Sequence, residues 1–199
     1  MILTEVSAPP AAAVPVRAFG EHLALGSGFA DDGAQDAVLE LYLRAAMAAI
    51  EARLGRALLA RDFSWSVQSW REEASQRLPV GPVRSVASVT LVEADGSESA
   101  ADPETWSVLR DSQRPRIVGR FGRSLPRIPR SGRAEIRLSA GFGETWDEVP
   151  ADLRQAVFLL AAHFYENRSD TGAVAGSMPF GVLVLIEAYR TSRIGGSGA

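Results

Sequence analysis

The sequence predicts an α+β fold, a small helical bundle core with an inserted antiparallel β region. Two long segments, residues 34–54 and 150–168, repeat their apolar side chains with the period of an α-helix. Between residues 58 and 137 the apolar side chains alternate instead, as they do in half-buried strands. We divide the 199 residues, as one domain, into an N-terminal arm (1–15), a first helical part (16–57), the β region (58–147), a second helical part (148–193) and a flexible tail (194–199).

Composition excludes several kinds of chemistry. The chain has no cysteine, which excludes disulfides, zinc thiolates and cysteine nucleophiles. All 21 basic residues are arginine, so a P-loop lysine and a Schiff-base lysine are excluded too, although a GC-rich genome would give the same bias. The net charge of −3 gives no general attraction to nucleic acid or acidic membranes. Without a signal peptide or an apolar run of about 18 residues, we expect a soluble protein made in a cytoplasm.

The N-terminal region combines a possible strand, an extended arm and a short helix. Residues 1–6 can form a short strand, and the Pro/Ala stretch 8–15 is typical of an arm that a neighbouring protein orders. Val16, Phe19 and Leu23 share a helical face, which predicts a helix over residues 16–25.

The helix expected over residues 34–54 ends at Gly55 and carries two apolar stripes. The bulky stripe consists of Leu39, Tyr42, Leu43, Ala46, Ile50 and Leu54. The smaller stripe consists of Val38, Leu41, Ala45, Ala48, Ala49 and Ala52. Two stripes allow contact with two neighbours. Both contacts can lie within the chain, or one can be made with another subunit.

The β region is predicted from short alternating runs. Phe63, Trp65 and Val67 alternate with polar residues, and residues 83–92 give one or two strands. The Asp95-Gly96 pair is typical of a hairpin turn. Further short strands are expected around Trp106, Ile117 and Ile136, and together these runs predict an antiparallel sheet.

The segment from residue 150 to residue 168 is expected to be the central helix. Its apolar residues include Leu153, Val157 and Leu160 on one face and Phe158 and Leu159 on the other, so several neighbours should cover it. After a linker, residues 180–193 predict a last helix.

No set of residues indicates catalysis. His22 and His163 each lie alone on a helix, where a histidine is usually packed or hydrogen-bonded. His163 and Glu166 have the spacing of half a di-iron motif, but the remaining ligands are missing. Gly141 and Gly143 follow a strand, yet Trp146 occupies the third glycine position of a dinucleotide fingerprint. We predict no enzyme activity, no metal and no cofactor.

One stretch, which we call the arginine segment (residues 110–137), is strongly basic. It holds nine arginines against Asp111 and Glu135, a balance of +7, so the rest of the chain sums to −10. The arginines are Arg110, Arg114, Arg116, Arg120, Arg123, Arg127, Arg130, Arg133 and Arg137. Three interpretations stay open: solvated strand faces, an acidic protein partner such as another copy of this chain, or DNA.

Taken in order, eleven short pieces resemble one family. The pieces are residues 22–23, 36–46, 50–51, 54–58, 78–79, 83–89, 139–143, 149–156, 163–168, 179–182 and 189–190. Their order and spacing over residues 16–190 are similar to those of the head–tail connector (adaptor) family of long-tailed phages and of the gene transfer agents derived from them. The N-terminal arm and the density of arginine depart from the family pattern.

The resemblance implies a structural virion component without catalysis. Members form a ring of about a dozen copies under the portal at the head–tail junction, with DNA passing through the channel without sequence specificity. The implied partners are the portal protein, a downstream head-completion (stopper) or tail protein and other copies of the chain, with no membrane. The arm before Pro15 and the tail after Tyr189 are expected to order on docking to the portal.

We assign nine residues to partner or subunit contacts: Arg123, Arg127, Arg130, Arg133, Tyr165, Arg168, Phe180, Tyr189 and Arg190. The alternatives are a DNA-binding accessory protein that uses the arginine segment and another tail-completion protein.

Overall fold

The computed structural model describes residues 1–23, 35–111, 113–168 and 178–190, which form two compact units. Unit 1 comprises Met1–Pro9 and Gly55–Glu144, and unit 2 comprises the described residues of Pro10–Leu54 and Thr145–Ala199. Unit 1 holds two antiparallel sheets and unit 2 holds the α-helices, so the predicted α+β class is confirmed. The predicted tail (194–199), residues 24–25 of the predicted first helix and residues 169–177 of the linker before the last helix lie outside the described residues.

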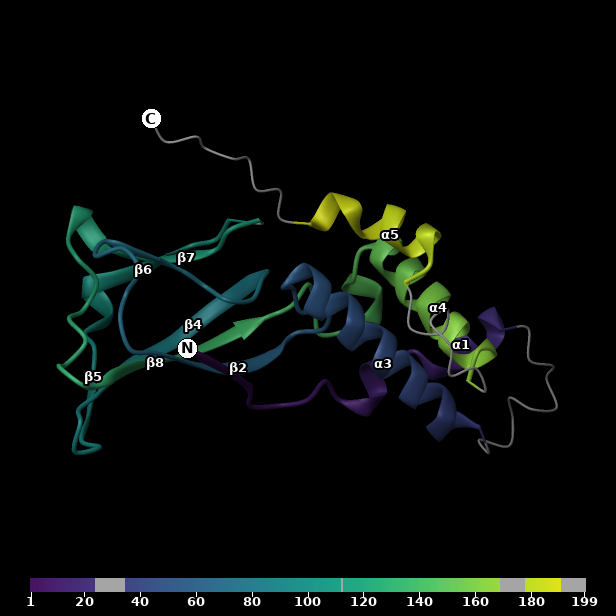
Figure 1. Cartoon of the computed structure of the whole chain (residues 1–199), viewed down its shortest axis with the longest axis horizontal. Helices are drawn as coiled ribbons and strands as arrows, with labels where there is room; N and C mark the ends of the chain where they lie inside the picture. Colours follow the sequence, from purple (N-terminus) through teal and green to yellow (C-terminus); the bar gives the residue numbers. More distant parts are fainter. Residues whose placement is uncertain (24–34, 112, 169–177, 191–199) are drawn as a thin grey trace. The chain divides into compact units, whose positions relative to one another are not determined.

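The larger sheet of unit 1 has the strand order β1-β2-β8-β4-β5, and every neighbouring pair is antiparallel (Figure 1). Its strands are β1 (Ile2–Glu5), β2 (Arg61–Val67), β8 (Arg133–Ala140), β4 (Val83–Val92) and β5 (Glu98–Ala100). The smaller sheet has the order β3-β7-β6. Its strands are β3 (Ser75–Arg77), β7 (Arg116–Gly119) and β6 (Trp106–Leu109). Two 3₁₀ turns, η2 (Pro103–Thr105) and η3 (Arg120–Gly122), flank β6 and β7.

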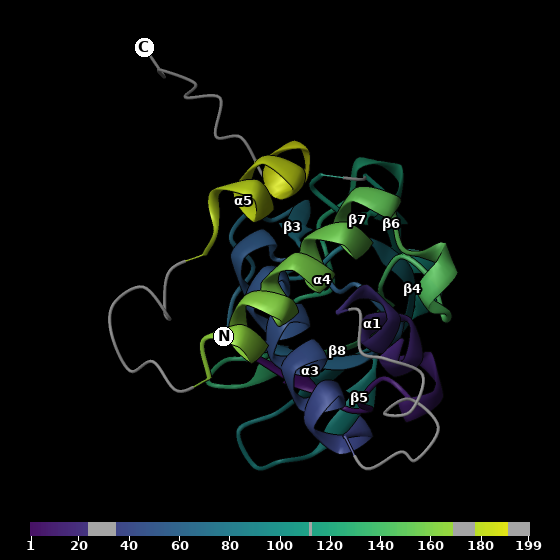
Figure 2. The same ribbon diagram turned by 90° about the vertical axis from the view of Figure 1, so that its right-hand side faces the viewer.

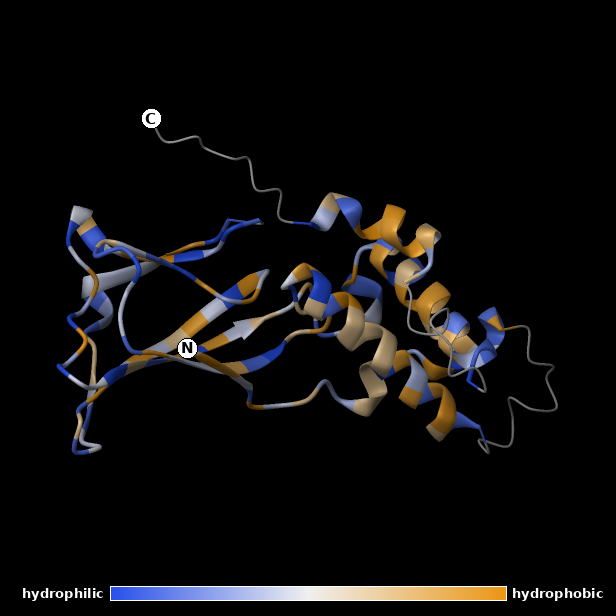
Figure 3. Ribbon diagram, viewed as in Figure 1, coloured by the Kyte–Doolittle hydropathy of each residue, from blue (hydrophilic) through white to orange (hydrophobic). Residues whose placement is uncertain are grey.

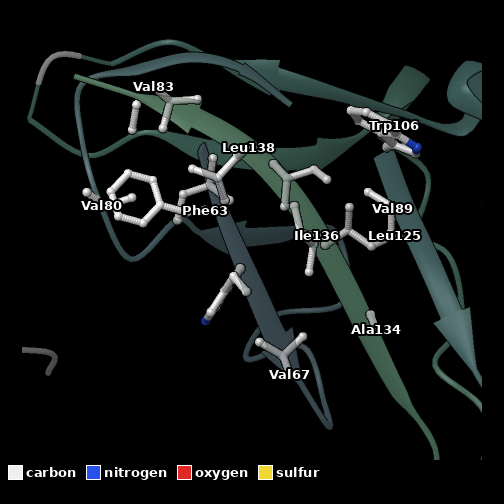
Figure 4. Packing of buried hydrophobic residues seen from close by; sticks show 14 of the residues in the cluster. Phe63, Val67, Val80, Val83, Val89, Trp106, Leu125, Ala134, Ile136 and Leu138 are labelled. Carbon is white, nitrogen blue, oxygen red and sulfur yellow. The ribbon is translucent and has the colours of Figure 1, made fainter. Parts of the chain in front are cut away.

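The alternating residues of β2 and β8 build the core of unit 1. Phe63, Trp65 and Val67 of β2 are buried while the residues between them are at least partly exposed. Ile136 and Leu138 of β8 lie opposite Trp65 and Phe63 in the ladder. Figure 4 shows Phe63, Ile136 and Leu138 gathered with Trp106 of the smaller sheet and with Leu125, which lies in the loop before β8. The predicted period of 2 therefore identified the face that is buried.

β4 is one strand, and the predicted turn follows it. Its pairing with β8 shifts register between Val83 and Ser85 and between Val86 and Ser88, which explains why its sequence alternates poorly. Gly96 has a φ of +88° in the turn to β5, where glycine fits without strain.

The first residues of the predicted arm belong to the larger sheet. β1 pairs with β2 from Ile2 opposite Ser66 to Glu5 opposite Phe63, and Arg61 forms an ion pair with Glu5 (N–O distance 3.0 Å). Residues of the same chain therefore order this part of the arm, and no other protein is needed for its pairing. The rest of the arm contains η1 (Ala11–Ala13), where Ala13 is buried.

Unit 2 contains four described α-helices and short 3₁₀ turns (Figure 2). The helices are α1 (Val16–His22), α3 (Asp36–Leu54), α4 (Ala151–Glu166) and α5 (Phe180–Ile186). The turns η4 (Trp146–Glu148) and η5 (Glu187–Tyr189) precede α4 and follow α5. A capping box joins Thr145 and Glu148 just before α4. The last helix was predicted over residues 180–193, but α5 ends at Ile186. The turn η5 and the extended Arg190 follow it.

α4 is the centre of unit 2, as predicted. It packs against both α3 and α5. Leu153, Ala156, Val157, Leu160 and Ala161 are buried on it. On its other side Phe158 contacts the rings of Phe19 and Trp146, both with centroids 5.7 Å away. Helices on more than one side explain why the middle of this segment is apolar all round.

The two stripes of α3 have different environments. The bulky stripe is buried at Leu39, Leu43, Ala46, Ile50 and Leu54. The smaller stripe is largely exposed: Val38 retains 45% and Leu41 64% of their surface, and Ala45, Ala48 and Ala52 are exposed as well. The tan and orange colouring of α3 in Figure 3 shows how apolar this helix is. α3 thus has two neighbours within the chain, α4 and α1, but its smaller stripe is largely left uncovered by the described residues. The contact of this stripe with another subunit stays a prediction.

Candidate interaction surfaces

Part of the arginine segment is used inside unit 1. Arg116 of β7 forms an ion pair with Glu72 (N–O distance 3.3 Å), and Arg120 forms one with Glu104 (2.8 Å). Arg133 at the start of β8 forms one with Glu135 (2.8 Å). The first two pairs connect a strand or turn to another segment of unit 1, and the third lies within β8. Exposed pairs of this kind contribute little to stability.

The acidic groups around the segment are engaged as well. A hydrogen bond from the Ser75 hydroxyl and the charge of Arg116 lower the pKa of Glu72. Backbone N–H groups of Arg114 and Gln113 donate to Asp111 and lower its pKa. The ionised forms of Glu72 and Asp111 are therefore favoured by groups next to them.

Five arginines of the segment form no ion pair with any residue that the structure describes. They are Arg110, Arg123, Arg127, Arg130 and Arg137, all exposed. Arg123, Arg127 and Arg130 lie in one loop, between η3 and β8, which we call the arginine loop (residues 123–132). Three of the four predicted residues of unit 1 are thus brought together as uncompensated charge, whereas Arg133 pairs with Glu135.

Two predicted residues of unit 2 form a pair at the end of α4. The Arg168 guanidinium lies over the Tyr165 ring at 4.8 Å and donates to the Tyr165 carbonyl at 2.8 Å. The Tyr165 ring also meets Tyr42 of α3 edge to face, with centroids 5.8 Å apart. An aromatic ring and a cation are thereby held together at the surface of unit 2.

The other predicted residues of unit 2 lie on α5 and η5. Phe180 begins α5 and keeps 79% of its surface exposed. Arg190 forms an ion pair with Glu187 (N–O distance 2.8 Å), and the Tyr189 hydroxyl donates to an Asp152 carboxylate oxygen at 2.8 Å. Tyr189 thus ties η5 to the first turn of α4 and has a structural task apart from any partner.

Tyr189→Phe is expected to lower the free energy of unfolding by about 1 kcal/mol, because Asp152 loses a hydrogen bond while the ring stays packed. Urea unfolding followed by circular dichroism measures this. Tyr42→Phe is the matched control, since the Tyr42 hydroxyl has no hydrogen-bond partner among the described residues. Equal stabilities of the two variants would contradict the assigned role of the Tyr189 hydroxyl.

The sequence interpretation missed several exposed apolar residues. Val184 lies one turn after Phe180 and retains 58% of its surface, so α5, largely orange in Figure 3, presents two large apolar side chains. Phe121 in η3 retains 87%. The i, i+4 spacing of Phe180 and Val184 was a usable signal for α5, but nothing in the pattern around Phe121 indicated its exposure.

The described residues offer no arrangement typical of an active site. His163 shares a hydrogen bond with Asn167 (Nδ1–Nδ2 distance 3.1 Å), and the His22 ring lies 5.4 Å from that of Phe158. Within the described part of the chain, no three histidine or carboxylate side chains are placed to hold a metal ion. None of the described helices is both long and apolar enough to cross a bilayer.

Solved structures give clear matches. The chain is 50% identical to a chain in the neck of an empty gene transfer agent particle computed with C6 symmetry, with a TM-score of 0.89 over 98% of both chains. It is 46% identical to a chain in the neck of a native particle computed with C12 symmetry (TM-score 0.84, 98% of both chains). A third match, from the virion of a native gene transfer agent particle, has 50% identity and a TM-score of 0.87 over the same shares.

No protein-family model and no curated protein matches the chain. At 46–50% identity over nearly the whole length of both chains, however, the neck proteins share far more than a fold with this protein. They also agree with the family that the order of its sequence pieces resembles. The chain belongs to the head–tail connector (adaptor) family of long-tailed phages and gene transfer agents.

Proposed function

We propose that this protein is the structural head–tail adaptor of a gene transfer agent or tailed phage particle. The observation that carries the proposal is its identity of 46–50% to chains of gene transfer agent necks over 98% of its length. In this role the protein is a virion component at the head–tail junction and performs no catalysis. A DNA-binding accessory protein is not favoured, because nothing in that role requires the fold of a neck protein.

The adaptor works as a multi-copy ring. Neck structures of the related chains were computed with C6 and C12 symmetry, which supports a ring of about a dozen copies here. The finer proposal is that the ring lies under the portal protein and above a stopper or tail protein, with DNA passing through its channel. In a ring each copy uses two different faces, one for each lateral neighbour.

Two surfaces of the chain suit such contacts. The exposed stripe of α3, consisting of Val38, Leu41, Ala45, Ala48 and Ala52, is an apolar helix face that no described part of the chain buries. The arginine loop carries three positive charges that form no ion pair with the described residues, while the chain outside the arginine segment sums to −10. An apolar face and complementary charges are the usual parts of a protein–protein contact. The nine residues assigned from the sequence keep their proposed role in partner or subunit contacts.

The proposal is tested by electron microscopy of particles from a strain that lacks this gene. DNA-filled heads and separate tails, without joined particles, are expected. The gene supplied in trans should restore joining. Normal tailed particles from the deletion strain would refute the adaptor role and would direct attention to DNA binding by the arginine segment.

Leu41→Asp is expected to lower the yield of joined particles about tenfold or more, because a carboxylate would be buried without a partner in the subunit contact. The stability of the free chain should change by less than about 0.5 kcal/mol, since the side chain is exposed there. Particle counts and thermal unfolding measure the two effects.

Ala18→Asp on the exposed side of α1 is the matched control, because it adds the same charge to another helix of unit 2. Unchanged particle yield with Leu41→Asp would remove the α3 stripe from the proposed contacts. A loss of stability in the free chain would mean instead that Leu41 acts in folding.

A further inference from the structure

Phe121 combines high exposure with a rare backbone conformation. Its side chain keeps 87% of its surface, the largest fraction among the exposed large apolar side chains that the structure describes. Its φ and ψ are +56° and +32°, in the left-handed region that bulky L residues seldom adopt. Holding an exposed phenyl group in this conformation does not stabilise the free chain. We therefore look for the reason for the conformation in a contact with another molecule.

The surrounding loop fixes this conformation. A Cβ atom at Gly119 would lie 1.9 Å from the carbonyl oxygen of Arg123, so the chain doubles back too closely for any residue but glycine at 119. The Arg123 N–H donates to the Arg120 carbonyl at 3.1 Å and closes the turn. Contacts within the chain therefore determine the conformation of this turn, and no partner is needed for it.

Both sides of the turn are attached to the body of unit 1. On one side Arg120 donates from Nε to the Trp106 carbonyl (3.0 Å) and pairs with Glu104 (2.8 Å). On the other side Leu125 is buried, and its N–H donates to the Glu73 carbonyl at 2.7 Å. The turn that carries the phenyl group is thus already ordered in the free chain. This lowers the conformational entropy that is lost when the phenyl group binds a partner.

The charges next to Phe121 indicate the chemistry of the partner. Arg123, Arg127 and Arg130 follow it along the loop, exposed and without ion pairs to described residues. A phenyl group needs an apolar pocket, and the arginines need carboxylates around it. Single-stranded DNA would require several aromatic side chains for stacking, and duplex backbone would leave the phenyl group unused, so a protein fits better.

Another copy of this chain can supply the carboxylates. Outside the arginine segment the chain sums to −10. Within unit 1, Glu93, Asp95 and Glu98 around the turn between β4 and β5 are exposed and form no ion pair with the described residues. The related necks were computed with C6 and C12 symmetry. In the proposed ring, copies of this chain are lateral neighbours.

We propose that Phe121 is the hydrophobic anchor of the contact between neighbouring copies in the ring, inserted into an apolar pocket that carboxylates of the next copy surround. This inference rests on the proposed adaptor function. It adds to that function the side chain that joins one copy to the next, and it explains why an exposed phenyl group is held in a strained turn.

Photocrosslinking in assembled particles tests the identity of the partner. The photoreactive p-benzoylphenylalanine replaces Phe121 in the full-length chain, supplied to the deletion strain, and mass spectrometry identifies the adduct. A covalent dimer of this chain is expected. An adduct to a different particle protein, an adduct to DNA, or no adduct would each overturn the proposal. The same group in place of exposed Gln68 is the control, and an equal dimer yield there would also overturn it.

Two substitutions separate assembly from folding. Phe121→Gly removes both the phenyl group and the strain, so the melting temperature of the free chain should stay level or rise, while joined particles fall about tenfold or more. Phe121→Leu keeps an apolar side chain and should assemble better than Phe121→Gly. If Phe121→Gly assembles normally while the deletion strain gives no joined particles, the anchor role of Phe121 is refuted and the adaptor function is not. Normal tailed particles from the deletion strain would instead refute the proposed function.

Discussion

Reversal of Arg123, Arg127 and Arg130 to glutamate is expected to reduce joined particles by a factor of about one hundred or more, while the free chain stays folded. All three side chains are exposed and form no ion pair with described residues, so their replacement breaks no known contact within the chain. In the proposed contact, however, three attractions to carboxylates become three repulsions. Like charges placed together at an interface cost several kcal/mol.

The measurement is a count of joined particles by electron microscopy in the deletion strain that expresses the variant. Thermal unfolding of the free chain is recorded alongside it. The control reverses three exposed arginines outside the segment, Arg17, Arg71 and Arg84, and so makes the same change in net charge. Joined particles at the wild-type level would remove the arginine loop from the interface. Salt-sensitive DNA binding that the variant loses would favour the DNA interpretation instead.

The sequence predicted those elements in which burial and period agree. α4 is recognisable because Leu153, Val157 and Leu160 repeat with a helical period and neighbours cover both of its sides. β2 and β8 are recognisable because one face of each is buried and the other is more exposed. In these elements a single physical cause, the burial of apolar side chains, determines both the sequence pattern and the structure.

The elements that the sequence did not predict lack that cause. β3 and β5 have three residues each and bury none of them, so no apolar pattern marks them. They are strands because their backbones pair with β7 and β4, which is a property of the folded sheet. Likewise, the exposure of the α3 stripe depends on where the other helices pack. Its residues alone predicted only that two contacts were possible.

The candidate surfaces were predicted in part for the same reason. Charge can be counted along a sequence, so Arg123, Arg127 and Arg130 were found. Which arginines form ion pairs cannot be read from the sequence, and Arg133 proved to be paired with Glu135. Phe121 was missed because its exposure follows from a left-handed turn that Gly119 permits and that no local apolar pattern encodes. Backbone geometry of this kind becomes visible only in the folded chain.

Gly141→Ala is expected to lower the free energy of unfolding by about 3 kcal/mol or more. A Cβ atom at this position would lie 2.4 Å from the Cα and backbone nitrogen of Ala60, and Gly141 has a φ of +140°. Backbone atoms cannot move aside as a flexible side chain could. The substitution would therefore separate two segments that the fold holds together.

These two segments are the ones by which the chain enters and leaves unit 1. Leu59 and Gly143 form a parallel bridge, the Ala60 N–H donates to the Gly143 carbonyl at 2.6 Å, and the Phe142 N–H donates to the Leu58 carbonyl at 3.1 Å. A shift at residue 141 would strain all three contacts. We expect the variant to unfold at a lower urea concentration and to yield few joined particles, because an unfolded insertion cannot present the arginine loop.

Gly96→Ala is the matched control, since Gly96 also has a positive φ (+88°) but a Cβ atom added there would meet no described atom within 4 Å. That control should cost only the intrinsic penalty of a left-handed alanine, about 1–2 kcal/mol. The difference between the two losses of unfolding free energy measures the effect of the close approach of the two segments. The conformational preference of glycine affects both variants. Equal losses of unfolding free energy in the two variants would mean that the backbone at Ala60 can shift with little loss of stability. The folded state of unit 1 would then be stabilised by its core around Trp65 and Ile136 and not by the contacts between residues 58–60 and 141–143.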